Sequence, residues 1–233
     1  MRILVVVPAY NEAENIQNVI RDLRDDFPAG DIIVINDGSR DETSPIARSL
    51  GVRVIDLPNN LGIGGAVQTG LKYGHMNNYD IAVQFDGDGQ HIAGEIEKTL
   101  KPALEGTDMA VGSRFIDDAG YIMPLTRRMG SAVFSGVISL ICRQKFTDTT
   151  SGFRSYGKKA MELFNEYYPD DYPEVEALIV AHKSKLTIRE VPVRMRPRGK
   201  GKSSITALGS VYYMVKVLLA IFVGTLKKRF IVR

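Results

Sequence analysis

The sequence predicts an α/β protein in which a mostly parallel central sheet carries helices on both faces. Along the first half, short apolar runs of strand length alternate with longer segments of helical periodicity, and polar or glycine-rich turns separate them. Strands that alternate with helices in this way form a parallel sheet that is covered on both sides. A length of 233 residues with 44% apolar content fits either one sizeable core or one domain with an appendage.

The elements follow from these patterns in chain order. We expect strands at residues 2–7, 31–36, 52–57, 81–85 and 109–111, a short strand at the end of the 147–154 loop, and a last strand at 187–193. We expect helices from Asn11 past Leu23, at 45–50, from the glycine-rich turn 59–65 to His75, and at 92–105, 129–141 and 174–181. Asn11 and Glu14 form a capping-box-like pair, which predicts that the first helix starts there.

Two carboxylates follow the strand at 81–85. Asp86 and Asp88 are two residues apart, so an extended chain points both side chains to the same side. Mg²⁺ and Mn²⁺ are held by one or two carboxylates and leave coordination sites open for substrate phosphates. An Asp-Gly turn without chemical function would explain this stretch taken by itself.

Polar clusters also follow two other strands of the predicted sheet. Residues 8–12 follow the first strand and residues 37–39 follow the second. Ligands of open α/β sheets bind outside the carboxyl ends of the strands, which is the edge that all three clusters share. The coincidence favours a ligand site over three unrelated turns.

Several motifs carry a resemblance to a known family. They are residues 8–12 (PAYNE), 36–43 (NDGSRDET), 60–64 (NLGIG), 86–91 (DGDGQH), 112–114 (GSR), 150–154 (TSGFR) and 190–193 (EVPV). In this order they resemble the family 2 inverting glycosyltransferases of the GT-A fold, over roughly residues 1 to 205. Within that family they are most similar to the polyprenyl-phosphate sugar synthases, the group of dolichol-phosphate mannose synthases and undecaprenyl-phosphate glycosyltransferases.

The resemblance implies roles for named residues. The nucleotide of a UDP- or GDP-sugar would be held by Pro8, Tyr10, Glu12, Asp37 and Asp86, the first four of them at the nucleoside. The divalent metal, Mg²⁺ or Mn²⁺, would be held by Asp86, Asp88 and Gln90. The catalytic set would be Asp86, Asp88, Arg114 and Arg198. The acceptor phosphate would be bound by Arg127, Arg128, Ser131, Arg198 and Lys202. The chain departs from many relatives at Asn36, where they have Asp, which leaves the nucleotide preference open.

The charge distribution indicates where an anionic partner is met. Residues 189–233 contain eleven Lys or Arg and one acidic residue, whereas the preceding 188 residues contain nineteen basic and twenty-six acidic ones. Five cations alternate along residues 194–202, where a cationic loop after the last strand would suit closure over phosphates. Within this loop Lys200 is an alternative to Lys202. Nucleic acid is not expected as a partner, because the loop lacks interleaved aromatic residues.

The C-terminal segment is both apolar and basic. Residues 211–223 are apolar apart from Lys216, and Lys227, Lys228 and Arg229 follow. This pattern predicts an amphipathic helix that lies on an anionic membrane surface or binds a small membrane protein; a core helix or a dimer contact is the alternative. We therefore divide the chain into a catalytic domain at 1–203, with a nucleotide-sugar half at 1–115 and an acceptor half at 116–203, and a tail at 204–233.

The N-terminus and the cysteine content indicate a location. The apolar run before Pro8 is too short for a signal peptide, and the single cysteine, Cys142, fits a reducing compartment, where we expect it to be a small buried apolar residue. We expect a cytoplasmic protein that associates peripherally with the inner face of the cell membrane.

The expected activity is the metal-dependent transfer of a sugar to a polyprenyl phosphate with inversion at the anomeric carbon. A saccharide hydroxyl is the alternative acceptor; it would need a carboxylate base, for which Asp170, Asp171 and Glu174 are candidates. A dinucleotide-dependent oxidoreductase is disfavoured, because Val67 stands where the third glycine of that fingerprint belongs. A binding module without catalysis is disfavoured because every polar cluster of the predicted site is retained.

Overall fold

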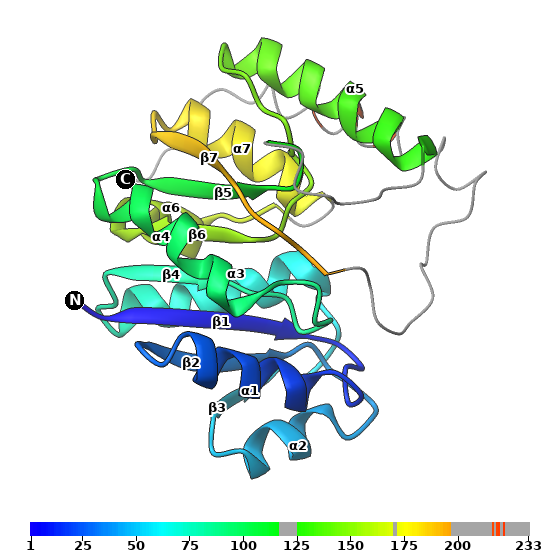
Figure 1. The fold of residues 1–233 in the computed structure, drawn as a ribbon, viewed down its shortest axis with the longest axis vertical. Coiled ribbons are helices and arrows are strands. Elements are labelled where there is room, and N and C mark those ends of the chain that lie inside the picture. The colour runs from blue at the N-terminus through cyan, green and yellow to red at the C-terminus, as the bar shows by residue number, and fades with distance from the viewer. Residues whose placement is uncertain (117–124, 170–171, 197–215, 217, 220, 222–233) are drawn as a thin grey trace.

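The computed structural model describes residues 1–116, 125–169 and 172–196 and four residues of the tail, 216, 218, 219 and 221. For residues 125–129 it describes the backbone only. The sheet has seven strands in the order β3-β2-β1-β4-β6-β5-β7 (Figure 1). They are β1 (Ile3–Ala9), β2 (Gly30–Asn36), β3 (Arg53–Asp56), β4 (Ile81–Gln84), β5 (Met109–Ser113), β6 (Arg154–Gly157) and β7 (Ile188–Pro192). Only β6 runs antiparallel to its neighbours, so the mostly parallel sheet is confirmed.

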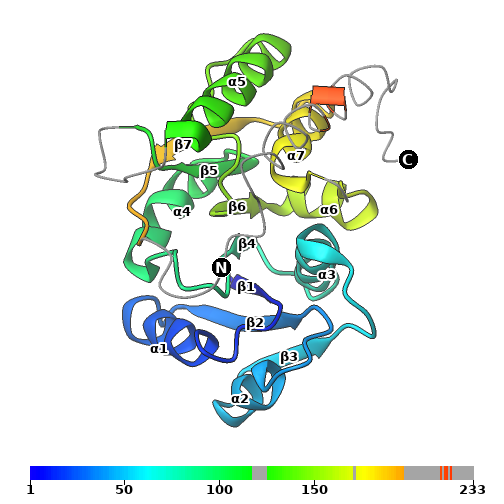
Figure 2. The same cartoon turned by 90° about the vertical axis from the view of Figure 1, so that its right-hand side faces the viewer.

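Helices cover both faces of this sheet (Figure 2). One face packs against α1 (Ile16–Asp26), α2 (Thr43–Ser49) and α4 (Ile96–Leu104). The other face packs against α3 (Gly62–Met76), α6 (Lys158–Glu166) and α7 (Pro173–Lys183), and α5 (Leu125–Cys142) packs on α7. Alternate residues of β1 enter the two cores, Leu4 and Val6 on one side and Val5 and Val7 on the other, and all four are buried. A strand buried on both faces needs a continuous apolar run, which is why this one could be recognised from sequence.

The topology creates a crevice beside β1. The chain crosses from β1 to β2 on one side and returns to β4 on the other, and both neighbours pair with β1 in parallel register. Ala9 lies opposite Asn36, and after β4 the chain stays on β1, because the backbone N–H of Gly87 donates to the carbonyl of Pro8. The three predicted polar clusters therefore leave the sheet at one edge, at the point where the strand order reverses.

Several element boundaries differ from the prediction. The first helix begins at Ile16, and Asn11 instead adopts a left-handed backbone with φ 55°. The predicted helix at 92–105 is a 3-10 turn, η1 (Ala93–Glu95), followed by α4. These are local shifts that leave the order of elements intact.

The largest difference lies around residue 155. The predicted short strand within 147–154 begins only at Arg154, and α6 after it was not predicted. β6 is buried but polar, because the Arg154 side chain donates to backbone carbonyls of Ser151 and Glu174, so it lacks an apolar run. Buried Ala160, Met161 and Phe164 have the helical spacing that would have predicted α6.

Part of the predicted tail helix contacts the main core. Ile221 is buried within the cluster formed with α5, α6 and α7, and the partly buried Leu218 packs against that cluster. Leu219 and Lys216 are exposed. The described part of the tail thus packs on its own domain, as the core-helix alternative expected. Cys142 is also in this core, where burial raises the pKa of its thiol to about 11, as expected of a structural cysteine.

Candidate active site

A cavity of about 210 Å³ opens at the carboxyl ends of β1, β2 and β4. Its walls are formed by Pro8, Ala9, Tyr10, Glu12, Asp37, Ile63, Ala66, Asp86, Gly87 and Asp88. The structure thus brings together all five residues predicted to bind the nucleotide, Asp86 among them, and the second predicted metal carboxylate, Asp88. Tyr10 lines this cavity and is 45% exposed, so its side chain is accessible to a ligand there.

Hydrogen bonds join the two loops that follow β1 and β2. The backbone N–H of Asn11 donates to Ser39 Oγ at 2.9 Å, and that of Glu12 donates to Thr43 Oγ1 at 2.8 Å. In return, Asn11 Oδ1 accepts from the backbone N–H of Arg40. The left-handed conformation of Asn11, which residues with short polar side chains tolerate, permits this exchange. The cavity wall is therefore preformed.

Asp37 is buried in the floor of this cavity. Its Oδ1 accepts from the backbone N–H of Leu61 at 2.7 Å, and only 3% of the residue is exposed. Burial raises the pKa of Asp37, and the backbone N–H groups of Leu61 and Gly62 oppose that rise. The neighbouring Gly38 has φ +69°, and a Cβ there would lie 2.8 Å from the backbone of Asn59. This turn therefore requires glycine beside the carboxylate.

His91 holds the loop that carries Asp86. The backbone N–H of Asp86 donates to His91 Nδ1 at 3.0 Å, so the proton of the neutral ring is on Nε2, which lies 3.7 Å from Asp86 Oδ2. The imidazole stacks on Phe153 with ring centroids 4.6 Å apart. Burial lowers the pKa of His91, which favours the neutral ring. His91, the last residue of the 86–91 motif, is thus required as histidine for a structural reason.

Gly152 packs beneath Asp86, and the space there admits no side chain larger than that of glycine. A Cβ on Gly152 would lie 2.8 Å from Asp86 Oδ2 and 2.8 Å from Gln84 Nε2. Gln84 Nε2 donates to Asp86 Oδ1, and Gln84 Oε1 accepts from the buried hydroxyl of Tyr156 at 3.1 Å. The carboxylate is therefore oriented by the core. Gln84 and Tyr156 were not predicted, because nothing in their local pattern marks them as neighbours of the site.

Arg114 is positioned by a buried carboxylate that the sequence did not reveal. Its Nε and Nη2 donate to the two oxygens of Asp148 at 2.6 and 2.7 Å, and Asp148 is fully buried. Glu190 in turn accepts from the backbone N–H groups of Thr147 and Asp148. Burial raises the pKa of Glu190. Arg114 Nη2 also donates to Thr150 Oγ1 at 2.9 Å, two residues before Gly152, which packs against Asp86, so this assembly is linked to the Asp86 loop.

Of the residues predicted to bind the acceptor, the structure describes the side chain of Ser131 alone. Ser131 lies on α5, and its buried hydroxyl has no hydrogen-bond partner among the described residues. Arg127 and Arg128 are in the first turns of α5, but their side chains lie outside the description, as do Arg198 and Lys202 entirely. The cationic loop is described as far as Arg196, whose backbone N–H donates to the carbonyl of Gln90 at 2.7 Å. This loop therefore leaves β7 beside the Asp86–Gln90 segment.

The carboxylates suit an open metal site. Within the described part of the chain, His, Cys, Asp and Glu nowhere form a group of three that could hold a metal ion. Asp86 and Asp88 line the same cavity, and Asp88 Oδ1 accepts from the backbone N–H of Gln90. Two carboxylates beside open space fit Mg²⁺ or Mn²⁺ whose remaining ligands come from a diphosphate and water. The side-chain nitrogen of Gln90 faces the carbonyl of Arg196 at 3.5 Å.

Comparison with known proteins supports the significance of this arrangement. The family model described as glycosyl transferase family 2 matches residues 4–164, from the second residue of β1 past the end of β6. The chain belongs to this family. The glycosyltransferase is 35% identical over 213 residues to the UDP-N-acetylglucosamine–dolichyl-phosphate N-acetylglucosaminyltransferase of Methanococcus voltae, covering 82% of this chain and 84% of that protein. It is 28% identical over 221 residues to the undecaprenyl-phosphate mannosyltransferase of Micrococcus luteus, covering 88% of each chain.

Solved structures share the fold of the glycosyltransferase. The glucosyl-3-phosphoglycerate synthase of Mycobacterium tuberculosis, in complex with Mn²⁺, uridine diphosphate and phosphoglyceric acid, superposes with a TM-score of 0.69 at 21% identity, covering 95% of this chain and 77% of that one. The mannosyl-3-phosphoglycerate synthase of Rubrobacter xylanophilus gives a TM-score of 0.73 at 18% identity, covering 100% and 77%. The predicted GT-A fold is confirmed. Among its described residues, the glycosyltransferase has no helix with the length and hydropathy that crossing a membrane requires.

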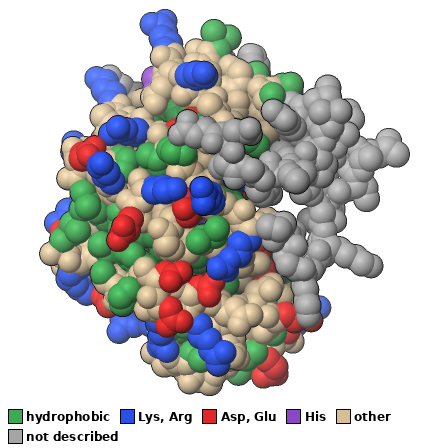
Figure 3. Space-filling model, in the orientation of Figure 1, with side chains coloured by type: hydrophobic (Ala, Val, Ile, Leu, Met, Phe, Trp, Pro, Cys, Tyr) green, Lys and Arg blue, Asp and Glu red, His purple; other side chains and the backbone are tan. Residues whose placement is uncertain are grey.

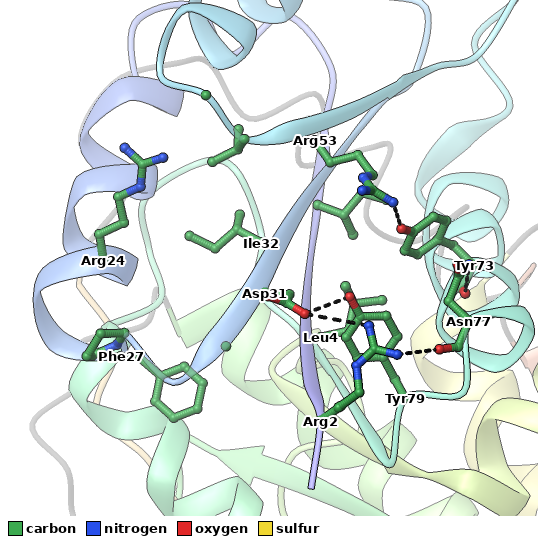
Figure 4. A pocket seen from close by; sticks show the side chains of 15 residues that line it. Arg2, Leu4, Arg24, Phe27, Asp31, Ile32, Arg53, Tyr73, Asn77 and Tyr79 are labelled. Atoms are coloured by element: carbon green, nitrogen blue, oxygen red, sulfur yellow. Dashed lines mark hydrogen bonds and ion pairs between the residues drawn. The ribbon is translucent and has the colours of Figure 1, made fainter.

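A larger cavity, of about 660 Å³, lies at the opposite edge of the sheet of the glycosyltransferase (Figure 4). It contains none of the predicted site residues, and its charged lining is mainly Arg2, Arg24 and Arg53. Arg2 donates to the carbonyl of Asn77 and Arg24 to that of Leu50, the residues that cap the C-termini of α3 and α2. These guanidinium groups satisfy helix carbonyls, so we assign this larger cavity a structural role.

Of the candidate bases for a saccharide acceptor, the structure describes only Glu174, and this residue is not at the cavity. Glu174 lies in the first turn of α7, and burial raises the pKa of its carboxyl group. It is absent from the walls of the 210 Å³ cavity. Asp170 and Asp171 lie outside the described residues. In the described part of the glycosyltransferase, the carboxylates at the cavity are thus Glu12, Asp37, Asp86 and Asp88, which were predicted to bind the nucleotide sugar and the metal.

Proposed function

We propose that this glycosyltransferase transfers a sugar from a UDP- or GDP-sugar to a polyprenyl phosphate, with inversion at the anomeric carbon and with Mg²⁺ or Mn²⁺. The observation that carries the proposal is the shared cavity at the strand ends, where Asp86 and Asp88 meet the predicted nucleoside residues. Relatives named for dolichyl-phosphate and undecaprenyl-phosphate acceptors, covered over most of their length, support the acceptor class.

The donor is assigned to the cavity walls. Tyr10 and Pro8 offer apolar surface to the base and ribose, and Glu12 and Asp37 offer acceptors for their N–H and hydroxyl groups. Asp86 and Asp88 would hold the divalent cation, which neutralises charge on the leaving diphosphate. The hydrogen bonds from Gln84 and to His91 keep Asp86 in one orientation before the donor arrives. A preorganised carboxylate of this kind loses little entropy on binding.

The acceptor needs orientation more than activation. A lipid phosphate is already an anion at neutral pH, so it can attack without a strong general base. Arg114, fixed by Asp148, supplies positive charge near the Asp86 loop, and the loop after β7 begins beside Gln90. We assign Arg127, Arg128, Ser131, Arg198 and Lys202 to the acceptor phosphate or the departing diphosphate on the grounds of sequence. The proposed setting is the cytoplasmic face of the cell membrane, where the side of the tail that exposes Lys216 and Leu219 would make the peripheral contact while Ile221 stays in the core.

A transfer assay tests this proposal. The purified full chain is incubated with labelled UDP- and GDP-sugars and either a polyprenyl phosphate or free saccharides, with EDTA and with added Mn²⁺ or Mg²⁺. We expect an organic-phase product that depends on the lipid phosphate, disappears with EDTA and returns with metal. Product formed only with the saccharide would favour the alternative acceptor, and transfer insensitive to EDTA would contradict the metal assignment.

A further inference from the structure

The chain that follows β7 lies against the loop of the predicted metal carboxylates. The backbone N–H of Arg196 donates to the carbonyl of Gln90 at 2.7 Å, and Met195 forms an isolated antiparallel bridge with His91. In Figure 1 this stretch, drawn in orange, runs from β7 along the carboxyl edge of the sheet. Residues 193–196, which we call the β7 extension, therefore form a short antiparallel pairing with this loop.

The two residues on the other side of this pairing each hold one of the metal carboxylates. The backbone N–H of Gln90 donates to Asp88 Oδ1 at 3.0 Å. His91 Nδ1 accepts from the backbone N–H of Asp86, also at 3.0 Å. A shift of the β7 extension would therefore be transmitted to both carboxylates through the hydrogen bonds that orient them.

One core contact and two acidic side chains anchor the β7 extension. At its start Val193 is buried in the core. In the middle, the backbone N–H of Arg194 donates to Glu95 Oε2 in η1 at 2.9 Å. At its end, Arg196 Nη1 forms an ion pair with Asp22 Oδ2 on α1. Because the N–H of Arg196 also bonds to the metal-carboxylate loop, Asp22 steadies that pairing directly.

The ion pair is partly exposed, which sets the size of its effect. The side chain of Arg196 is 47% exposed and that of Asp22 is 31% exposed. A pair at this exposure changes an equilibrium constant by about two- to fivefold. Figure 3 shows basic and acidic side chains intermingled on the face that carries α1 in Figure 1, so loss of one carboxylate there changes the long-range field little. An effect of Asp22 on the site should therefore pass through its contact with Arg196.

We propose that Asp22 and Arg196 are positioning residues of the active site, whose ion pair holds the β7 extension against the loop that carries Asp86 and Asp88. Neither partner is among the residues that form the walls of the 210 Å³ cavity, so both act through the extension. The inference rests on the proposed function, because it assigns to the ion pair an effect on the affinity of the proposed metal site.

The alternative role for Arg196 is direct contact with a substrate phosphate, which its place among the alternating cations of residues 194–202 suggests. In the structure its guanidinium group is instead paired with a carboxylate of α1. A phosphate ligand would have to give up that pair, whereas a positioning residue keeps it. The two roles therefore differ in a testable way: direct contact makes Arg196 far more important than Asp22, and positioning makes the two equally important.

Cation binding by the full chain measures the effect without turnover. We expect Asp22→Asn and Arg196→Gln each to raise the Kd for Mn²⁺ alone, measured by electron paramagnetic resonance, about two- to fivefold. The double variant should bind no more weakly than either single variant, because both remove the same interaction. Asp25→Asn is the matched control: Asp25 is an exposed carboxylate three residues further along α1, and this variant should bind as the wild type does.

Three results would overturn the proposal. They are wild-type Mn²⁺ affinity in Asp22→Asn, a loss in Arg196→Gln that greatly exceeds that in Asp22→Asn, and losses that add in the double variant. Exchange of the two charges, Asp22→Arg together with Arg196→Asp, should restore most of the lost affinity, which a general structural effect of either substitution would not do. Failure of this exchange to restore affinity counts against the proposal.

Hydrogen exchange of the metal-free full chain follows the pairing itself. We expect Asp22→Asn to speed exchange of the backbone N–H of Arg196 about two- to fivefold, because this N–H is bonded across the pairing. The amides of β1 should keep their protection, which shows that the fold is unaffected. Unchanged exchange at Arg196 would show that the ion pair does not hold the β7 extension.

The transfer assay separates this inference from the proposed function. Asp22→Asn should mainly raise the Mn²⁺ concentration that gives half-maximal rate, with a smaller effect on the rate at saturating Mn²⁺. A wild type that binds Mn²⁺ and transfers sugar, beside an Asp22→Asn variant with the same Mn²⁺ dependence, refutes the positioning role alone. A wild type that binds no Mn²⁺ refutes the metal assignment of the proposed function, and with it the effect on cation affinity inferred from the ion pair.

Discussion

The two edges of the sheet carry opposite charges that are used in different ways. At the carboxyl edge, Glu12, Asp37, Asp86 and Asp88 line a cavity of about 210 Å³. At the amino edge, three arginines line a larger cavity of about 660 Å³. The arginines Arg2 and Arg24 donate to main-chain carbonyls at helix ends, whereas Asp37 and Asp88 accept from main-chain N–H groups and still border open space.

The comparison shows that the size of a cavity does not identify a site. Helices α1, α2 and α3 end near the amino edge, where their last carbonyls carry partial negative charge that arginine neutralises. At the carboxyl edge four carboxylates are gathered around one small cavity, an arrangement that a bound cation would stabilise. We therefore expect substitutions at the carboxyl edge to affect activity and those at the amino edge to affect stability.

The largest effect should come from Asp88→Asn. Loss of one metal carboxylate should reduce transfer by about 10³-fold, because charge stabilisation by a bound cation is worth several kcal/mol. The free energy of unfolding should change by about 1 kcal/mol or less. Parallel measurements of transfer rate and urea denaturation check both parts. Full activity of a folded variant would show that the carboxyl edge is not the catalytic one.

Gly152→Ala should reduce activity about 10- to 100-fold, because the added methyl would displace Asp86, and small misplacements of reacting groups have effects of this size. Gly94→Ala is a matched control, since a Cβ there meets nothing within 4 Å. Steady-state kinetics with varied Mn²⁺ provides the measurement. An alanine tolerated equally at both positions would mean that Asp86 does not require this packing.

Arg24→Ala at the amino edge should leave transfer unchanged. It removes the hydrogen bond to the carbonyl of Leu50, which connects α1 to the end of α2, and should lower the free energy of unfolding by about 1 kcal/mol. Chemical denaturation together with the transfer assay tests this. A large loss of transfer without loss of stability would show that the amino edge contributes to activity, contrary to the role we assign to it.

The smallest effect concerns Glu190, a carboxylate whose partners lie within the protein. Its pKa is raised from 4.5 by burial, so the folded protein binds this proton more tightly than the unfolded chain does. This group therefore makes the free energy of unfolding fall as the pH rises from about 4.5 through the raised pKa, by at most about 1.4 kcal/mol per pH unit. Over that pH range, the free energy of unfolding should fall less with rising pH in Glu190→Gln than in the wild type. Parallel pH profiles of the two proteins would contradict the raised pKa of Glu190.

The strands, and the meeting of the polar residues after β1, β2 and β4 at one cavity, could be predicted because both depend on local pattern and simple topology. The buried run in β1 is continuous, and the polar residues after β1, β2 and β4 stand where those strands end. Parallel neighbours end at the same edge, so Tyr10, Asp37 and Asp86 had to meet once the strand order was established.

The sequence by itself determined the class of fold, the edge that carries the site and the family, since each depends on residues close together along the chain. Only the tertiary structure decided that Asp148 positions Arg114, that Gly152 packs beneath Asp86, and that β6 runs antiparallel. The first two contacts join residues 34 or more positions apart. In β6, buried polar groups that are hydrogen-bonded to the backbone stand in place of an apolar run. Such pairings depend on how separate segments pack, and packing leaves no periodic signal in a single sequence.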